Sequence, residues 1–308
     1  MKLNVLKQAS LPDALTAELA RRYHLVELTA LTDADFRALA GTFTVLITNG
    51  EATVTRALIA SLPALELIAV FGVGYDGVDV QAAAEHQVRV SHTPGVLTDD
   101  VADLALGLML ATSRQIVAAH KFIEAGEWAA GGFPWTQKVS GSRVGIVGMG
   151  RIGQAIARRC EGFAMQIAYH DRKRLPALNY AWREDLLTLA AESDFLVICT
   201  PGTAANQGLI NQPVLGEKGI LINISRGSVI DEPALESGII AGAGLDVFSH
   251  EPAVPAGLLQ RSNVVVTPHM ASATWSTRAA MAQLVLDNVA CWAEKKALVT
   301  PVAESLAD

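Results

Sequence analysis

Short apolar runs alternate along the chain with longer stretches in which alanine and leucine recur at helical spacing. Each run has the length of a strand and is bounded by polar residues or glycine. Continuous apolar strands separated by helices are typical of parallel sheets whose two faces are both covered. The pattern therefore predicts an α/β fold of doubly wound parallel sheets, with strands at Val45–Thr48, Leu67–Phe71, Val88–Ser91, Arg143–Val147, Gln166–Tyr169, Phe195–Cys199, Ile220–Ile224 and Val264–Thr267.

Two breaks divide this pattern into domains. The first is the turn His92–Gly95, and the second is Thr267–His269. The helix expected after the second break, Trp275–Lys295, is followed by no expected strand, so it should pack on the N-terminal part of the chain. We therefore expect two domains of ordinary size: a dinucleotide-binding domain of residues 96–272, and a substrate domain of residues 1–95 and 273–308.

A glycine-rich loop lies between the strand Arg143–Val147 and an expected helix, Arg151–Glu161. In a GxGxxG loop the glycines permit a tight turn, close approach of a pyrophosphate and close packing of helix on strand. The helix N-terminus presents free N–H groups to the phosphates. We expect a Rossmann cofactor domain inserted in a flavodoxin-like substrate domain, with cofactor contacts from Gly148, Gly150, Arg151, Ile152 and Gly153.

The end of the next strand bears on the choice between NADP and NAD. Three consecutive cations, Arg172, Lys173 and Arg174, could hold a 2′-phosphate, to which arginine can donate two parallel hydrogen bonds. Asp171 precedes them and could instead accept hydrogen bonds from the ribose hydroxyls, as an acidic residue does in NAD enzymes. We expect NADP(H) to be preferred, with NAD(H) as the alternative.

Composition narrows the class of protein. The net charge of −7 argues against nucleic acid and anionic membranes as main partners. The cysteines form no CxxC pair and no group of His, Cys or carboxylates has ligand spacing, so we expect a reducing compartment and no metal site. No signal peptide is visible and the apolar stretch Leu104–Ala111 is too short to span a bilayer, so the expected location is the cytoplasm.

Three polar residues at expected strand ends suit the reduction of a ketone. Hydride transfer to a carbonyl requires a proton for the developing alkoxide, and a histidine such as His269, with an ordinary pKa of about 6.5, can supply it. A carboxylate such as Glu251 favours the charged ring, and a guanidinium such as Arg226 can hold a carboxylate substrate. Ligands bind at such strand ends in open α/β sheets. His250, next to Glu251, is interpreted as a loop residue.

Five further motifs accompany the glycine-rich loop: Phe71–Asp79, Thr93–Asp103, Asn223–Gly227, Gly244–Pro252 and Thr267–Thr274. With them the chain resembles, over nearly its whole length, the D-isomer-specific 2-hydroxyacid dehydrogenase family. The resemblance implies that Arg226 grips the substrate, that His269 is the general acid/base, and that Glu251 is its partner. It also implies further contacts: N–H groups near Val73 and Gly74 with the substrate carboxylate, Asp246 with the nicotinamide carboxamide, and Thr98, Thr200 and Ile224 with the cofactor.

Within the family the chain is most similar to the NADPH-dependent glyoxylate/hydroxypyruvate reductases, through Tyr169–Arg172 and Gly131–Thr136. This implies a small 2-keto acid as substrate, although phenylpyruvate-type reductases share much of the pattern. In such reductases the segment of Trp135 can reach the active site of the partner subunit; a buried core tryptophan is the alternative. The apolar helix Val101–Ala111 is expected either at a homodimer interface or inside the domain.

Other members of the superfamily fit less well. Corepressors of the C-terminal-binding type keep the three catalytic residues but act as non-catalytic NAD(H)-sensing interaction proteins; the sequence ends soon after its last expected helix, which weakens this alternative. In formate dehydrogenases the position that corresponds to Glu251 would be a glutamine, so Glu251 argues against this alternative. Phosphoglycerate dehydrogenases carry a regulatory domain, and residues 48–50 offer no cation for a phosphate.

Two stretches are shorter than is usual for the family. Arg226 and Glu251 are 25 positions apart, and the segment from Gly208 to Ile220 is also short. We expect both shortenings to fall on peripheral helices, Glu232–Ser237 and Pro213–Glu217, and to leave the strand ends in place. A true deletion and residues missing from the given sequence are both open at this point.

Overall fold

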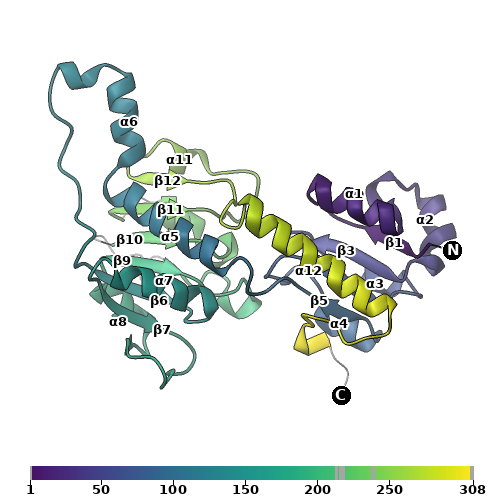
Figure 1. Cartoon of the computed structure of the whole chain (residues 1–308). Coiled ribbons are helices and arrows are strands. Elements are labelled where there is room, and N and C mark those ends of the chain that lie inside the picture. Colours follow the sequence, from purple (N-terminus) through teal and green to yellow (C-terminus); the bar gives the residue numbers. More distant parts are fainter. Residues whose placement is uncertain (1, 212–213, 215–218, 237–239, 306–308) are drawn as a thin grey trace. The chain divides into compact units, whose positions relative to one another are not determined.

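The computed structural model describes residues 2–211, 214, 219–236 and 240–305. The chain divides into two compact units, residues 1–97 with 274–308 and residues 98–273. Each unit contains one sheet in which the paired strands run parallel, with helices on both faces (Figure 1). This confirms the predicted fold class of two doubly wound α/β domains.

The first unit has a five-stranded sheet in the order β2-β1-β3-β4-β5. This is the strand order of a flavodoxin-like domain, the class of domain that was predicted. Alternate residues point to opposite faces of a strand. On one face Leu6, Leu46, Ile68 and Val90 form a buried core. The strands are β1 (Asn4–Lys7), β2 (His24–Glu27), β3 (Val45–Asn49), β4 (Leu67–Phe71) and β5 (Arg89–Ser91).

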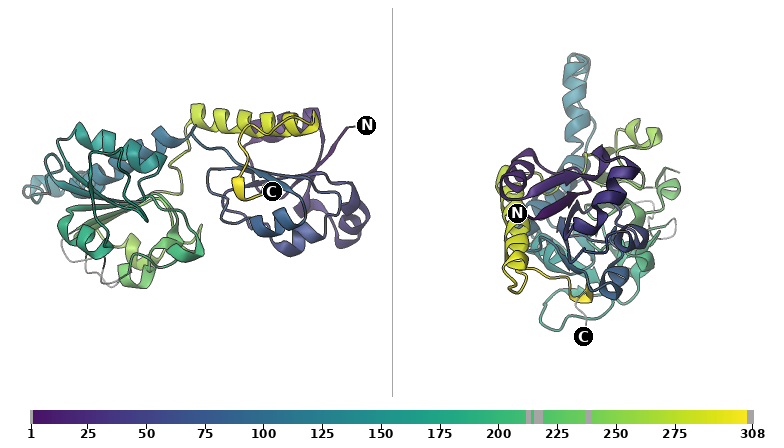
Figure 2. Two further views of the ribbon diagram at one scale, coloured as in Figure 1. Left: turned by 90° about the horizontal axis from the view of Figure 1, so that it is seen from below. Right: turned by 90° about the vertical axis from the view of Figure 1, so that its right-hand side faces the viewer.

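Helices cover both faces of this sheet. Figure 2 shows α12 and α1 on the face opposite to α3 and α4, and α12 packs against β4. The helix α12 follows the whole second unit in the sequence, so it returns to the first unit as expected. The helices are α1 (Asp13–Arg22), α2 (Asp33–Leu39), α3 (Arg56–Ala60), α4 (Val80–Glu85) and α12 (Trp275–Ala293), with 3-10 turns at Leu28–Ala30, Ala40–Thr42 and Ala303–Ser305.

The second unit has a seven-stranded sheet in the order β12-β11-β10-β9-β6-β7-β8. The strand order reverses between β6 and β9, and ligands of such sheets bind beyond the carboxyl ends of the strands at this switch point. The strands are β6 (Arg143–Val147), β7 (Gln166–His170), β8 (Ala181–Trp182), β9 (Phe195–Ile198), β10 (Ile220–Asn223), β11 (Gly242–Leu245) and β12 (Val264–Val266).

In this unit α5 and α7 pack together, and α5 also lies on β10 and β11. A second apolar core combines Leu189 of α8, Leu235 of α10 and Leu258 of α11 with residues of the central strands. In contrast, α6 extends away from the sheet of its own unit (Figure 1). The helices are α5 (Thr98–Ser113), α6 (Ile116–Glu124), α7 (Arg151–Glu161), α8 (Leu186–Glu192), α10 (Glu232–Glu236) and α11 (Ala256–Leu259), with 3-10 turns at Glu127–Ala129, Ala204–Asn206 and Gly227–Val229.

Several elements differ from the sequence-based expectation. The strands β1, β2, β8 and β11 were not predicted, and six of the eight predicted strands differ from the observed bounds by one residue at one end. Of the expected peripheral helices, α10 covers Glu232–Glu236, whereas Pro213–Glu217 lies outside the described residues except for Val214. No single helix among the described residues is long and apolar enough to cross a membrane; α5 and α6 meet that length and composition only as a pair bent by 54°.

Candidate active site

The glycine-rich loop turns sharply from β6 into α7. Gly148 has φ +94°, a conformation that favours glycine, and its N–H donates to the His170 carbonyl over 2.9 Å. A Cβ on Gly153 would lie 2.2 Å from the Gly148 carbonyl oxygen, so only glycine lets α7 begin this close to β6. A Cβ on Gly150 would meet open space. The loop therefore leaves room beside its backbone and beside the N-terminus of α7, which fits a dinucleotide pyrophosphate.

Asp171 ties the end of β7 to the glycine-rich loop. Its Oδ2 accepts a hydrogen bond from Met149 N–H over 2.9 Å, and its Oδ1 accepts one from Arg172 N–H over 2.7 Å. The buried Tyr169 accepts a third bond from Leu175 N–H over 2.8 Å. Both oxygens of the NAD-type acid are thus engaged by the backbone, while Arg172, Lys173 and Arg174 are exposed on the turn.

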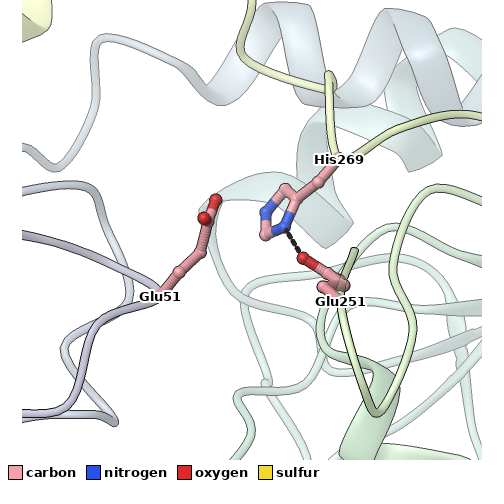
Figure 3. Close-up of side chains that lie close together, drawn as sticks. All are labelled: Glu51, Glu251 and His269. Atoms are coloured by element: carbon pink, nitrogen blue, oxygen red, sulfur yellow. Dashed lines mark hydrogen bonds and ion pairs between the residues drawn. The ribbon is translucent and has the colours of Figure 1, made fainter. Parts of the chain in front are cut away.

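His269 and Glu251 form the pair that the sequence suggested. The Nδ1 of His269 lies 2.7 Å from Oε2 of Glu251 (Figure 3), and the other oxygen of Glu251 accepts from Phe248 N–H over 2.8 Å. Burial works to raise the pKa of Glu251, but the hydrogen bonds from His269 and Phe248 and the charges of His269 and Arg226 lower it on balance. Glu251 therefore stays ionised beside the ring. His250 lies in an exposed turn, as expected.

Asp246 holds the loop that carries His269. Its carboxylate accepts three hydrogen bonds, from the Thr267 hydroxyl at 2.7 Å, Met270 N–H at 2.8 Å and Ala271 N–H at 2.9 Å. Its carbonyl accepts from His269 N–H over 2.9 Å. His269 itself has φ +48°, a conformation that costs energy for a residue other than glycine and that these bonds maintain.

This role of Asp246 was not predicted, because the bonds join residues on two different loops. The Asp246 side chain is fully buried, and burial raises its pKa despite the three donors that favour the charged form. The sequence offered little signal for this role, because the strand that Asp246 follows, β11, was not predicted. The neighbours of Asp246 at Thr267–Ala271 become partners only once β11 and β12 pair.

Arg226 follows β10 and is held by its backbone. The buried Asn223 donates to the Arg226 carbonyl over 3.0 Å and accepts from Ser225 N–H over 3.0 Å. A Cβ on Gly202 would lie 2.6 Å from Cγ of Arg226, so glycine there makes room for the arginine side chain. Since the charge of Arg226 also lowers the pKa of Glu251, these groups share one electrostatic environment within the second unit.

The remaining expected cofactor residues lie at separate points of the same unit. Thr98 begins α5, and Ile224 is buried directly after β10. The backbone nitrogen of Thr200 lies close to Gly148, where a Cβ would approach it to 2.9 Å. The Thr200 hydroxyl accepts from Asn206 Nδ2 over 2.9 Å. The structure thus brings Thr200 to the glycine-rich loop at the switch point of the sheet.

Val73 and Gly74 belong to the first unit, in the loop after β4. Within the described part of the chain, their N–H groups donate to no protein acceptor. Two adjacent unpaired N–H groups can bind an anion such as a carboxylate. The arrangement is thus compatible with the predicted contact to the substrate.

Comparison with known proteins finds a matching family model and similar full-length relatives. Residues 106–271 match the family model described as D-isomer specific 2-hydroxyacid dehydrogenase, NAD binding domain. Over 97% of this chain and 99% of the relative, the sequence is 44% identical to hydroxyphenylpyruvate reductase of Plectranthus scutellarioides. Over the same shares it is 39% identical to glyoxylate/hydroxypyruvate reductase A of Arabidopsis thaliana.

A solved structure is also similar over nearly its full length. It is the NADPH-dependent glyoxylate/hydroxypyruvate reductase of Sinorhizobium meliloti in complex with NADP and malonate. The TM-score is 0.92 at 40% identity, covering 99% of this chain and 98% of that one.

Proposed function

Because the chain belongs to the D-isomer-specific 2-hydroxyacid dehydrogenase family, we propose that it uses NADPH to reduce a small 2-keto acid, glyoxylate or hydroxypyruvate, to the D-2-hydroxy acid. The observation that carries the proposal is the 2.7 Å bond between His269 Nδ1 and Glu251 Oε2, in the unit that also holds Arg226 and the glycine-rich loop. The names of the relatives from Arabidopsis thaliana and Sinorhizobium meliloti support the substrate class.

The bound nicotinamide supplies the hydride for this reaction. Arg226 binds the substrate carboxylate and polarises the adjacent carbonyl, and the N–H groups of Val73 and Gly74 bind the carboxylate from the first unit. His269 donates the proton from Nε2 to the carbonyl oxygen, while Nδ1 stays bonded to Glu251. The ionised Glu251 stabilises the positive charge that the ring carries before this transfer. A general acid of this kind is worth about 10²–10⁴-fold in rate.

The preference for NADP(H) is part of the proposal. Contacts would come from Gly148, Gly150 and Gly153 to the pyrophosphate, and from Arg172, Lys173 and Arg174 to the 2′-phosphate. The engagement of both Asp171 oxygens by backbone N–H groups supports this choice, since the NAD-type acid already has partners. Asp246, Thr98, Thr200 and Ile224 complete the proposed cofactor contacts. Arg172→Ala should reduce the preference for NADPH over NADH, and an unchanged ratio would count against the assignment.

A second candidate substrate is an aromatic keto acid. It is favoured by the 44% identity to a relative named hydroxyphenylpyruvate reductase. Both candidates use the same catalytic residues and differ only in the group beyond the carbonyl. Because the same residues would act on either keto acid, an activity assay must decide between the two substrates.

We propose that two copies of the chain associate through α6 and the segment after it. No residue of α6 is buried, and its Ile116 and Ile123 are more than half exposed. Trp128 is 67% exposed and Trp135 is fully exposed. In the single chain Trp135 is therefore not a buried core residue. Burying this apolar surface against a second copy would stabilise a homodimer, which light scattering after size exclusion would detect.

The deciding experiment follows NADPH and NADH oxidation at 340 nm with glyoxylate, hydroxypyruvate and phenylpyruvate. Rapid turnover with one of the first two acids supports the main proposal, and selective turnover with phenylpyruvate supports the aromatic candidate. Tight NADPH binding without turnover of any acid would favour a sensing protein instead. His269→Ala should lose about 10²–10⁴-fold in kcat, and activity close to wild type would rule out its assigned role.

A further inference from the structure

In the loop after β4, the N–H groups of Val73 and Gly74 each belong to a peptide group whose carbonyl accepts a hydrogen bond. The carbonyl of Gly72 accepts from Thr93 N–H over 2.8 Å. The carbonyl of Val73 lies 2.9 Å from Nδ1 of His92. These carbonyls share peptide groups with Val73 N–H and Gly74 N–H respectively. Each of these two donors is therefore attached to a carbonyl that the segment after β5 holds in place.

The geometry of the peptide group gives these bonds a directional effect. In a planar trans peptide the C=O and N–H bonds point in opposite directions. A bond that fixes the Val73 carbonyl therefore also fixes the direction of Gly74 N–H. Because a carbonyl oxygen can only accept, Nδ1 of His92 carries the hydrogen. Hydrogen bonding at the carbonyl also polarises the peptide and makes the N–H a stronger donor.

His92 is itself firmly placed within the first unit. The Tyr75 ring meets the imidazole edge to face, with centroids 5.2 Å apart and planes at 85°. The Thr300 hydroxyl donates to the His92 carbonyl over 2.6 Å, and His92 N–H donates to the Thr300 carbonyl over 3.2 Å. The fully buried Asn288 of α12 fixes Thr300 through bonds of 2.8 and 3.1 Å. The imidazole thus has one position relative to the loop.

We infer that His92 is a positioning residue that aims Gly74 N–H at the carboxylate of the keto acid and so sets the affinity for that group. The inference rests on the proposed function, which places the substrate carboxylate at the N–H groups of Val73 and Gly74. His92 transfers no proton in this role. Its contribution is therefore to substrate binding and not to the chemical step.

Two substitutions separate the hydrogen bond from the packing of the ring. His92→Phe keeps an aromatic ring against Tyr75 but removes the donor to the Val73 carbonyl. His92→Asn replaces the ring, yet its amide nitrogen can occupy the place of Nδ1 and restore the donor. His86→Phe is the matched control, because His86 is an exposed histidine of the same unit at the end of α4.

Steady-state kinetics with glyoxylate and NADPH, together with inhibition by oxalate as a carboxylate probe, test the inference. For His92→Phe we expect the KM for glyoxylate and the Ki of oxalate to rise about 3- to 10-fold, the effect of one lost hydrogen bond. The kcat and the KM for NADPH should stay near wild type, since only binding of the acid is affected. His92→Asn should recover most of the loss, and His86→Phe should change nothing.

The outcomes distinguish the two proposals. If wild-type protein turns over glyoxylate and His92→Phe leaves its KM and the oxalate Ki unchanged, the inference about His92 is overturned while the proposed function stands. Equal losses in His92→Phe and His92→Asn would also overturn it, because the donor would then be irrelevant. If wild-type protein turns over no 2-keto acid, both proposals fail.

Discussion

At the scale of single residues, the proposed mechanism couples proton transfer by His269 to the charge of Glu251, because the two side chains are hydrogen-bonded. Because the pKa of Glu251 is lowered in the folded chain, its charge is present at neutral pH and is lost only as the pH falls through that lowered value. The ionised carboxylate favours the protonated ring, which is the form that donates to the keto acid. The pH range for reduction should therefore depend on Glu251.

We expect Glu251→Gln to slow glyoxylate reduction at neutral pH by about 10- to 100-fold, a part of what a general acid is worth. Without the carboxylate the ring loses its proton at lower pH, so the alkaline limb of the pH profile of kcat/KM should move toward lower pH. Oxidation of the hydroxy acid, which needs the neutral ring, should suffer less. Glu192→Gln, which removes a surface carboxylate paired with Arg183, is the control; an unshifted profile in Glu251→Gln would contradict this account.

The side chain of Arg226 occupies space that is free only because Gly202 has no Cβ. In Gly202→Ala the new methyl group would lie 2.6 Å from Cγ and 3.0 Å from Cβ of Arg226, atoms too near the backbone to move freely. We expect the KM for glyoxylate to rise, by up to about 10²-fold for a displaced substrate-binding group, with the KM for NADPH little changed. Gly41→Ala, whose Cβ meets nothing within 4 Å, is the matched control. Similar KM values in both variants would show that Arg226 tolerates displacement.

The candidate site residues could be proposed from the sequence, but the hydrogen bonds that hold them in place could not. His269, Glu251 and Arg226 lie in recognisable motifs, and the structure places all three in one unit. The bonds from Asp246 to Thr267, Met270 and Ala271 depend on strand pairing. The bond from His92 to the Val73 carbonyl joins segments 19 positions apart. Such contacts have no local signature in a single sequence.

At the scale of elements, a helix or strand could be predicted where its sequence has a clear hydrophobic pattern. The helix α7 was predicted with its observed bounds, Arg151–Glu161, because one face is apolar and a glycine-rich loop precedes it. The strand β11 was missed because its sequence, GAGL, has little strand propensity. Its glycines are required by packing, since a Cβ on Gly244 would lie 2.9 Å from Leu108 of α5. Tertiary packing here overrides local preference.

In the turn after β7, we expect Asp171 to support the binding of both cofactors and Arg172 to determine the preference for NADPH over NADH. In Asp171→Asn one of the two backbone N–H groups, of Met149 or Arg172, loses its acceptor, because an amide has a single oxygen. We expect the KM values for NADPH and NADH to rise together by about 3- to 10-fold, with their ratio unchanged. Arg172→Ala should instead change the ratio. A change in ratio in Asp171→Asn would mean that Asp171 contacts the ribose directly.

At the scale of the whole molecule, all proposed cofactor residues lie in one continuous segment, residues 98–273, whereas Val73, Gly74 and His92 lie in the other unit. A ligand that binds only the folded form stabilises it by about 2.7 kcal/mol at 100 times its Kd. Cofactor binding should thus stabilise one unit selectively, because every proposed contact with the cofactor lies in that segment.

Hydrogen exchange with and without saturating NADPH measures this selectivity directly. We expect slower exchange in peptides covering β6, the glycine-rich loop and β7, because the phosphates engage N–H groups at the start of α7 and the nearby Asp171 turn stiffens with them. Peptides covering β1 to β2, residues 4–27, should exchange at an unchanged rate. Equal protection of both regions would mean that the units unfold as one cooperative body, so that the stability gained at the glycine-rich loop is shared by the sheet that carries Val73 and Gly74.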